Sequence, residues 1–453
     1  MDRLALLFLA VAFALAGWKI AECQPAGNFV SLAHPTGSSP GSGQKDSVAP
    51  AVAAEARPPP EAGRLRLDAD FVSSSPGQAV HAASLVELRD GRLRAVWFSG
   101  SREGAGDVAI KSAVLDAATH RWSDETTLYD RERIQRGLWR YVKKIGNPVI
   151  ARAPDGSLLL WMVNVSLGGW AGSSITWARS DDEGVTWSGP KRLVTSPFLN
   201  ISTLVKGAPF FYQNGEIGLP VYHEFVSKFS EILRISVQGK IIDKARIPGS
   251  QTQLQPIVMV TDETHAQMYM RSGRAVAVMT SQTTDAGKTW SATRATNWPN
   301  PDSALAGVVT ADRRQWLALN PGQKNREVLA LLQTSLGGSF DGARPWIVES
   351  GAVRETRLSV TDFERLLGDE LKSSGASESQ TRAYVGSARR QLCVHETCSE
   401  EFSYPFLLQS RDGFLHMVYT WHRTRIKHVR LDPLQVFQAL PVAPAVIKHA
   451  ATH

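Results

Sequence analysis

One local pattern recurs through most of this chain: an apolar strand, a two-residue turn of the Asp-Gly kind, and a second strand ending near an aromatic residue. Such turns between strands are the strongest short-range signal for a β-hairpin. The turns lie at Asp90-Gly91, Asp155-Gly156, Asn214-Gly215, Asp262, Asp312 and Asp412-Gly413. Successive turns are 65, 59, 48, 50 and 100 residues apart, which is too long for one hairpin and fits a four-stranded blade. The sequence therefore predicts an all-β domain built from six repeated units.

A second motif of the form S-x-D-x-G-x-T-W interleaves with the hairpins. It occurs at residues 180–187 (SDDEGVTW), and residues 283–290 (TTDAGKTW) repeat it; residues 333–340 (QTSLGGSF) resemble a decayed third copy. We expect the Asp to accept backbone N–H groups within the turn, the Gly to supply a positive φ, and the Trp to pack beneath the hairpin. The motif is then a structural staple, remote from chemistry.

The 100-residue spacing before the last unit contains the only helix signals. A capping-box pattern at residues 361–364 (TDFE) precedes several leucines, so we expect a short helical insertion over residues 359–398. Cys393 and Cys398 lie at its end. They are close enough to form a small disulfide loop in an oxidising compartment, and two free thiols are the alternative.

The N-terminal segment is typical of an exported protein. Residues 1–23 contain an apolar run of signal-peptide length, which serves either as a cleaved leader or as a short anchor. Residues 24–63 are rich in Pro, Ala, Ser and Gly, so we expect a disordered linker, and residues 441–453 form a tail. The expected location is periplasmic or secreted, with attachment to an inner membrane as the alternative; this segment is also the expected route to any membrane association.

Charge and cysteine content exclude some partners. The net charge of +7 is mild for 453 residues, so we expect no nucleic-acid partner. Three cysteines with no CxxC or HExxH motif do not favour a metal site, and no cofactor is expected.

Over residues 75–432 these motifs resemble the sialidase superfamily, in its branch with Asp-box (BNR) repeats. The phrases HAASLVELRDG, VWFSGSREGAGDVAI, GNPVIARAPDG and EFSYPFLLQSRDG are similar to its bacterial sialidase-like members. The resemblance implies a six-bladed β-propeller over residues 64–440. It also implies a retaining glycoside hydrolase that acts on the terminal acidic sugar of a glycan, sialic acid or a related sugar. A non-catalytic carbohydrate-binding propeller and a hydrolase or lyase for another uronic or keto-deoxy sugar acid are the alternatives.

The resemblance also implies a catalytic tyrosine. Such enzymes pair a Tyr nucleophile with a Glu, because an anionic nucleophile would be repelled by the substrate carboxylate. Tyr404, in EFSYP, matches the nucleophile position. Glu224 ends an apolar strand and is the expected acceptor of the tyrosine proton, with His223 orienting it and Glu231 as an alternative.

The general acid is expected in the glycine-bearing loop SREGAGD. Asp107 is the first candidate, with Arg102 adjusting its pKa, and Glu103 competes for the same role.

The cationic clamp departs from the family pattern, since His81-Ala82 stands where the first arginine is usual. Arg271 and Arg326 are expected to bind the substrate carboxylate, because guanidinium groups bind carboxylates with two parallel hydrogen bonds. The other candidates for substrate contacts are His81, Lys206, Asn320 and Arg423. Arg423 belongs to a basic, aromatic stripe at residues 421–427 (WHRTRIK), which either extends the glycan groove or guards a strand edge.

Overall fold

A computed structural model describes residues 26–31, 68–72, 75–196, 200–352 and 357–434. The predicted leader at residues 1–23 and the tail at residues 441–453 lie outside the described residues. Within the described residues, strands predominate and the α-helices are few: α2 (Arg131–Leu138), α3 (Val360–Ser373) and α4 (Glu378–Leu392). The predicted all-β class is therefore confirmed.

Six antiparallel sheets follow one another along the described chain, each with its strands mostly in sequential order. Sheet 1 holds β2 (Ala79–Glu87), β3 (Leu93–Gly100), β4 (Ala109–Leu115) and β5 (Thr126–Asp130). Sheet 2 holds β6 (Lys144–Arg152), β7 (Leu158–Val165), β8 (Ser173–Ser180) and β9 (Lys191–Arg192). Sheet 3 holds β10 (Leu204–Val205), β11 (Phe210–Phe211), β12 (Ile217–His223), β13 (Phe229–Ile235) and β14 (Ile241–Arg246).

The second half of the chain repeats this plan. Sheet 4 holds β15 (Gln253–Val260), β16 (Ala266–Ser272), β17 (Ala277–Thr283) and β18 (Arg294–Pro299). Sheet 5 holds β19 (Ala306–Val309), β20 (Arg314–Leu319), β21 (Val328–Ser335) and β22 (Trp346–Ser350). Sheet 6 holds β26 (Phe402–Gln409), β27 (Leu415–Trp421), β28 (Arg425–Leu431) and, from the other end of the chain, β1 (Asp68–Phe71).

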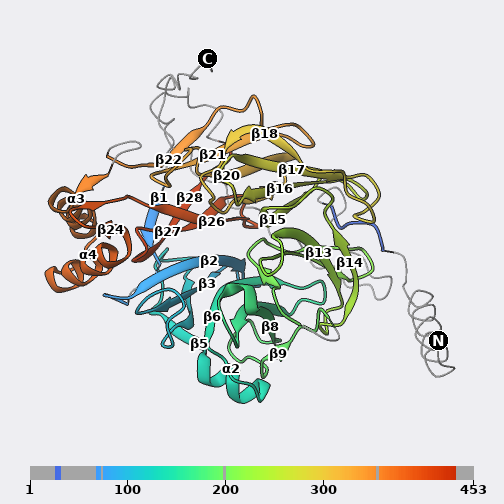
Figure 1. The fold of residues 1–453 in the computed structure, drawn as a ribbon, viewed down its shortest axis with the longest axis horizontal. Helices are drawn as coiled ribbons and strands as arrows, with labels where there is room; N and C mark the ends of the chain where they lie inside the picture. The colour runs from blue at the N-terminus through green and yellow to red at the C-terminus, as the bar shows by residue number, and fades with distance from the viewer. Residues whose placement is uncertain (1–25, 32–67, 73–74, 197–199, 353–356, 435–453) are drawn as a thin grey trace, which may run out of the picture.

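Neighbouring sheets meet through their first strands. β2 contacts β6, β15 contacts β19, β19 contacts β26, and β26 returns to contact β2. In Figure 1 the sheets are accordingly arranged around the middle of the ribbon. Large apolar side chains such as Trp97, Trp161 and Trp316 are fully buried in these sheets. The first strands therefore line the interior of the molecule.

Five of the six predicted hairpin turns join the first and second strands of their sheets, and the turn at Asn214-Gly215 joins the short β11 to β12. We call the end of the sheets where these turns lie the turn face. The first strands begin at the opposite end, which we call the site face. The prediction of six hairpins from turn residues is confirmed, since each turn is fixed by local backbone chemistry.

The two intact S-x-D-x-G-x-T-W motifs form the turns that lead into the fourth strands of sheets 2 and 4. Asp182 accepts hydrogen bonds from the backbone N–H of Thr186 at 2.9 Å and from its hydroxyl at 2.6 Å. Asp285 makes the same two bonds to Thr289. Gly184 has a φ of 82°, as predicted for this position. These contacts lie on the turn face and have a structural role.

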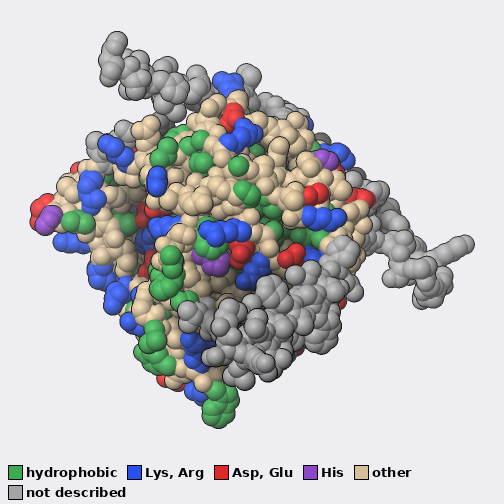
Figure 2. Space-filling model, turned by 45° about the vertical axis from the view of Figure 1, so that its right-hand side comes forward, with side chains coloured by type: hydrophobic (Ala, Val, Ile, Leu, Met, Phe, Trp, Pro, Cys, Tyr) green, Lys and Arg blue, Asp and Glu red, His purple; other side chains and the backbone are tan. Residues whose placement is uncertain are grey.

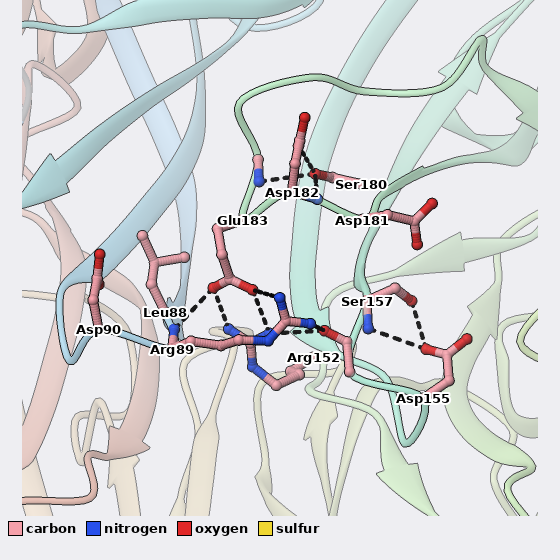
Figure 3. A network of polar contacts seen from close by, with 12 residues as sticks. Leu88, Arg89, Asp90, Arg152, Asp155, Ser157, Ser180, Asp181, Asp182 and Glu183 are labelled. Atoms are coloured by element: carbon pink, nitrogen blue, oxygen red, sulfur yellow. Dashed lines mark hydrogen bonds and ion pairs between the residues drawn. The ribbon is translucent and has the colours of Figure 1, made fainter.

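The turn face also carries an ion-pair network that joins sheets 1 and 2 (Figure 3). The carboxylate of Glu183 lies 2.7 Å from Nη2 of Arg152 and accepts the backbone N–H of Arg89 at 2.9 Å. Nη2 of Arg152 also donates to the carbonyl oxygen of Glu87. One carboxylate thus stabilises the contact between two neighbouring sheets.

The helical insertion is present, with one change from the prediction. The N-cap of α3 is Ser359, whose hydroxyl accepts the N–H of Asp362, so the cap lies two residues before the predicted Thr361. Ser359 and Thr361 each offer a hydroxyl cap followed by an acidic residue, and the path of the chain in the folded structure decides which of the two begins the helix. A disulfide joins Cys393 and Cys398 within a small sheet formed by β23 (Leu358–Ser359), β24 (Cys393–Val394) and β25 (Thr397–Cys398).

The insertion covers the face of sheet 6 that carries the predicted basic stripe. Arg425 lies 4.4 Å from the ring centres of both Phe71 and Tyr384, a residue of α4. Lys427 is partly buried and forms ion pairs with Glu349 and Glu370. Trp421 is fully buried. The stripe is therefore an intramolecular contact surface, and the prediction that it extends a glycan groove is wrong for these three residues.

Phe29, which lies within the predicted linker, is a core residue. Phe29 is fully buried, packs against Phe210 and Tyr212, and donates its N–H to the carbonyl oxygen of Glu263 at 2.7 Å. Residues 26–31 therefore belong to the folded part. A single buried aromatic side chain holds them there, and no periodic pattern in the sequence predicts this contact. Residues 32–67 lie outside the described residues.

Among the described helices, none combines the length and the apolar character needed to cross a bilayer.

Candidate functional site

A repeated irregularity marks the start of the first strands on the site face. The ladders of β2, β6, β15 and β26 each shift register there, as at a β-bulge. In each of the six sheets a non-glycine residue with a positive φ lies either within the first four residues of the first strand or up to four residues before it: Ala82, Asn147, Ser202, Gln255, Asp302 and Tyr404. Positive φ is costly for such residues, and strained positions of this kind cluster at functional sites.

Three of these residues precede a proline: Pro148, Pro256 and Pro405. Proline has no N–H to give to a strand ladder, so within sheets it is confined to edges, strand starts and bulges. A bulge re-aims the side chain that it carries. Asn147, Gln255 and Tyr404 all contribute to the polar network described next, which makes the bulges the devices that position the site.

The hydroxyl of Tyr404 is the centre of this network. Its oxygen accepts a hydrogen bond from Nε2 of Gln255 at 2.9 Å and another from Nη1 of Arg271 at 3.1 Å. Arg271 is in turn held by Asp302, whose carboxylate lies 2.6 Å from its Nε. Among the described residues, no carboxylate is hydrogen bonded to the Tyr404 hydroxyl. The tyrosine is therefore surrounded by donors.

The orientation of the Gln255 amide follows from its neighbours. Nη1 of Arg271 lies 3.0 Å from Oε1 of Gln255, and because a guanidinium can only donate, that atom must be the amide oxygen. The amide nitrogen then faces Tyr404 and also donates to the hydroxyl of Tyr222 at 3.4 Å. Asn147 donates to the same Tyr222 hydroxyl at 3.3 Å. Gln255 consequently cannot accept a proton from Tyr404.

A buried carboxylate organises two further arginines. Oε1 of Glu401 lies 2.8 Å from Nε of Arg423 and 3.3 Å from Nη1 of Arg326. Burial by itself would raise the pKa of Glu401, but the two guanidinium groups and the hydroxyl of Ser403 hold it at about 2. Glu401 is thus charged at all ordinary pH values and fixes both arginines beside Tyr404, whose ring centre is 6.0 Å from the guanidinium carbon of Arg326.

His81 lies against the tyrosine. Its ring centre is 4.0 Å from that of Tyr404, and its Nδ1 is 2.8 Å from the hydroxyl of Thr420. Burial lowers the pKa of His81 well below its usual value, and nearby Arg423 and Arg326 lower it further. The imidazole is therefore neutral and supports the ring of Tyr404.

Lys206 is buried beneath the same ring. Its Nζ donates to the carbonyl oxygen of Pro405 at 2.9 Å and lies 5.8 Å from the Tyr404 ring centre. Burial lowers the pKa of this amine to about 7. A cavity of about 10 Å³ beside Lys206, lined in part by Ile257 and Phe406, is far too small for a sugar.

The predicted acid loop is only partly joined to this cluster. The carboxylate of Asp107 accepts hydrogen bonds from the N–H and the hydroxyl of Ser101, both at 2.9 Å, and is exposed. Arg102 is exposed as well. Glu103 does reach the site, since its carboxylate lies 2.8 Å from Nη1 of Arg423. Of the two acid candidates, Glu103 is the one that the structure connects to the arginines.

Glu224 lies near the cluster without contacting Tyr404 directly. Its backbone N–H and that of Phe225 both donate to the hydroxyl of Ser202. Burial raises the pKa of Glu224, while Lys228 and Arg271 lower it. His223 instead pairs with Glu231 at 3.1 Å and stacks on Phe229, so it orients Glu231 and not Glu224 as predicted.

Asn320 is a buried structural residue. Its amide nitrogen donates to the carbonyl oxygens of Val328 and Phe402, and its oxygen accepts the hydroxyl of Ser303. The predicted substrate contact is wrong, because these bonds already use the amide within the protein interior.

Sequence reasoning missed Gln255, Tyr222, Asn147, Asp302 and Glu401. A signal for some of them was present: Asn147-Pro148, Gln255-Pro256 and Tyr404-Pro405 share a polar residue before proline at the start of a strand. Asp302 and Tyr222 carry no such mark, since their roles come from strands far apart in the sequence.

Charged side chains of both signs gather near the middle of the face shown in Figure 2. Among the described residues, no group of three or more His, Cys, Asp or Glu side chains is arranged to hold a metal ion. The chemistry that this geometry offers is recognition of an anion by arginine, next to a tyrosine hydroxyl.

The comparison with protein families decides the relationship of the chain. Residues 91–417 match the BNR repeat-like domain family. The chain belongs to the BNR repeat-like domain family. No curated protein matches it by sequence.

Solved structures agree with this family. A Hadza microbial sialidase is 14% identical with a TM-score of 0.57, and the match covers 79% of this chain and 66% of that one. An intramolecular trans-sialidase from Ruminococcus gnavus, in complex with oseltamivir carboxylate, is 12% identical with a TM-score of 0.56, covering 83% of this chain and 97% of that one. A Dyadobacter fermentans protein of unknown function is 12% identical with a TM-score of 0.59, covering 82% and 98%. These similarities show that the chain shares its fold with the two sialidases, and the predicted resemblance to proteins with BNR repeats is confirmed by the family match.

Proposed function

We propose that this protein is a sialidase-type glycoside hydrolase that acts on a terminal acidic sugar of a glycan. The observation that carries the proposal is the placement of Arg271, Arg326 and Arg423 around one tyrosine on the site face. Arginine is the residue best suited to binding a carboxylate. The trans-sialidase with the same fold is in complex with oseltamivir carboxylate. We also propose that the six sheets close into a six-bladed propeller and that the protein is exported.

In this mechanism the arginines bind the sugar carboxylate and Tyr404 attacks the anomeric carbon. Arg271 and Gln255 both donate to the tyrosine oxygen and hold it in position for the attack. Glu224 is the proposed acceptor of the tyrosine proton, because burial raises its pKa and makes its carboxylate a stronger base. As the bond from Tyr404 to the anomeric carbon forms, the bond from that carbon to the leaving oxygen breaks. Glu103, paired with Arg423, is the proposed proton donor to that oxygen, and Asp107 is left with a role in its own loop.

Turnover of a fluorogenic sialic acid glycoside by the wild type and Tyr404→Phe tests this mechanism. We expect kcat to fall by about 100-fold or more in the variant. Tyr269→Phe is the matched control, since that hydroxyl donates to Gln267 in sheet 4 and takes no part in the network around Tyr404. Equal turnover by wild type and Tyr404→Phe would rule out the tyrosine nucleophile.

A second function, binding without hydrolysis, is favoured by Gln255. An activated nucleophile normally has an adjacent base, and the group beside Tyr404 is an amide whose oxygen is occupied by Arg271. If the site only binds, the wild type will take up sialic acid in calorimetry but not cleave the glycoside. Gln255→Glu would then place a carboxylate at the hydroxyl and create turnover. In a working hydrolase the same change would leave turnover equal or lower.

A further inference from the structure

The end of α2 holds a tryptophan in an unfavourable conformation. Trp139 follows the helix with φ 49° and ψ 42°, the left-handed region in which helices usually end with glycine. For a residue with a side chain this conformation costs roughly 1 kcal/mol. The side chain packs against almost nothing, since Trp139 is 94% exposed. Packing within the fold therefore does not explain why a tryptophan is presented here.

Two other apolar side chains lie beside it. Tyr141 is 56% exposed and Leu167, on the loop between β7 and β8, is 77% exposed. Nε of Arg140 donates to the hydroxyl of Ser166 at 2.7 Å, so the loops that carry Tyr141 and Leu167 are adjacent. We call Trp139, Tyr141 and Leu167 the apolar patch. Isolated apolar residues on a surface are common, but three on joined loops require an explanation.

The surroundings of the patch are strongly basic. Residues 131–144 contain six Lys or Arg and a single acidic residue, Glu132. Lys143 is exposed, and its N–H donates to the carbonyl oxygen of Val165 beside Leu167. Exposed Trp, Tyr and Leu flanked by Lys and Arg are typical of segments that lie in the interface of a bilayer containing anionic lipids. A protein partner would favour a patch whose core is depleted of charge.

We propose that the apolar patch docks the folded domain onto a lipid bilayer with anionic headgroups. β6 starts at Lys144, directly after this segment, and carries Asn147 of the tyrosine network. Docking therefore places the site face close to the membrane surface, within reach of glycans attached to it. This proposal does not depend on the proposed function, because it concerns a surface that takes no part in the chemistry.

Hydrogen exchange of the full chain tests this docking. Because exchange is followed segment by segment, protection of the apolar patch is measured separately from any insertion of residues 1–23. The probes are vesicles of phosphatidylcholine alone and vesicles with about 30% phosphatidylglycerol. We expect exchange in residues 138–143 and 166–170 to slow by about fivefold with the anionic vesicles only. The double variant Trp139→Gly with Leu167→Ser should lose this protection. Glycine suits the backbone at 139, so the variant is expected to fold.

Val185→Ser is the matched control, because Val185 is 80% exposed on the turn face and its loss should leave the protection unchanged. Unchanged exchange with both kinds of vesicle would overturn the proposal. Protection by soluble dextran sulfate equal to that by vesicles would also overturn it and would indicate a soluble polyanion as the partner.

Discussion

The turn face and the site face each contain a glutamate held between two arginines. Glu183 lies between Arg89 and Arg152 at the surface, whereas Glu401 lies between Arg326 and Arg423 in the interior. Contacts with arginine lower the pKa of both carboxyls, and that of Glu401 reaches about 2 despite its burial. The same residue types thus form a surface clip in one place and a rigid support for a binding site in the other. The difference is solvent, which screens the first group and is excluded from the second.

The largest effect is expected from Glu401→Gln. Removing this carboxylate leaves two guanidinium groups without their buried partner, and breaking a buried pair in this way costs about 3–5 kcal/mol of unfolding free energy. Urea unfolding followed by circular dichroism measures it. A loss no greater than that of Glu183→Gln would show that the two clusters are equivalent.

Acid should act on the buried cluster next most strongly. The folded pKa of Glu401 is about 2 against an ordinary 4.5, so its contribution is complete above pH 4.5 and disappears as pH falls toward 2. The difference corresponds to about 3 kcal/mol. The unfolding free energies of wild type and Glu401→Gln should therefore converge as the pH falls from about 5 to about 2, the range in which this group titrates. Parallel curves would contradict the assigned protonation.

Lys206 predicts a second rise of stability with pH, in a higher pH range. Its folded pKa of about 7 lies below the ordinary 10.5, so the unfolded chain binds more protons in between and wild-type stability rises with pH. Relative to Lys206→Met, the wild type should gain on the order of 1 kcal/mol per pH unit above pH 7. Lys240→Met, an exposed change on the turn face, should show a constant difference from wild type. A constant difference for Lys206→Met too would mean that this lysine stays charged.

The smallest effect is expected from Glu183→Gln. This pair is partly exposed to solvent, and such pairs contribute about 0–1 kcal/mol. The effect should shrink further when salt is added, because ionic screening acts on exposed charges. Thermal unfolding at low and high salt is the measurement. A loss of several kcal/mol that does not depend on salt would show that the turn face is as well insulated as the interior.

Local patterns predicted the hairpins, the Asp boxes and the helical insertion, because each depends on residues a few positions apart. Tyr404, Arg271 and Arg326 were found through a family resemblance. Glu401 was missed although it stands three residues before Tyr404, because no local rule distinguishes a buried carboxylate from a solvated one. The stripe at residues 421–427 was misinterpreted for a similar reason, since the alternation of side chains along a strand does not reveal what packs over either face.

The sequence alone determined where this chain turns, since Asp-Gly pairs and proline act on the backbone within a few residues. Only the tertiary structure decided that Gln255, Arg271 and Tyr404, up to 149 residues apart, share hydrogen bonds. Such contacts arise when first strands of different sheets pack together, and burial then determines the pKa and the partners of each charged group. A chain's turns are encoded locally, whereas the protonation and partners of its buried groups depend on everything packed around them.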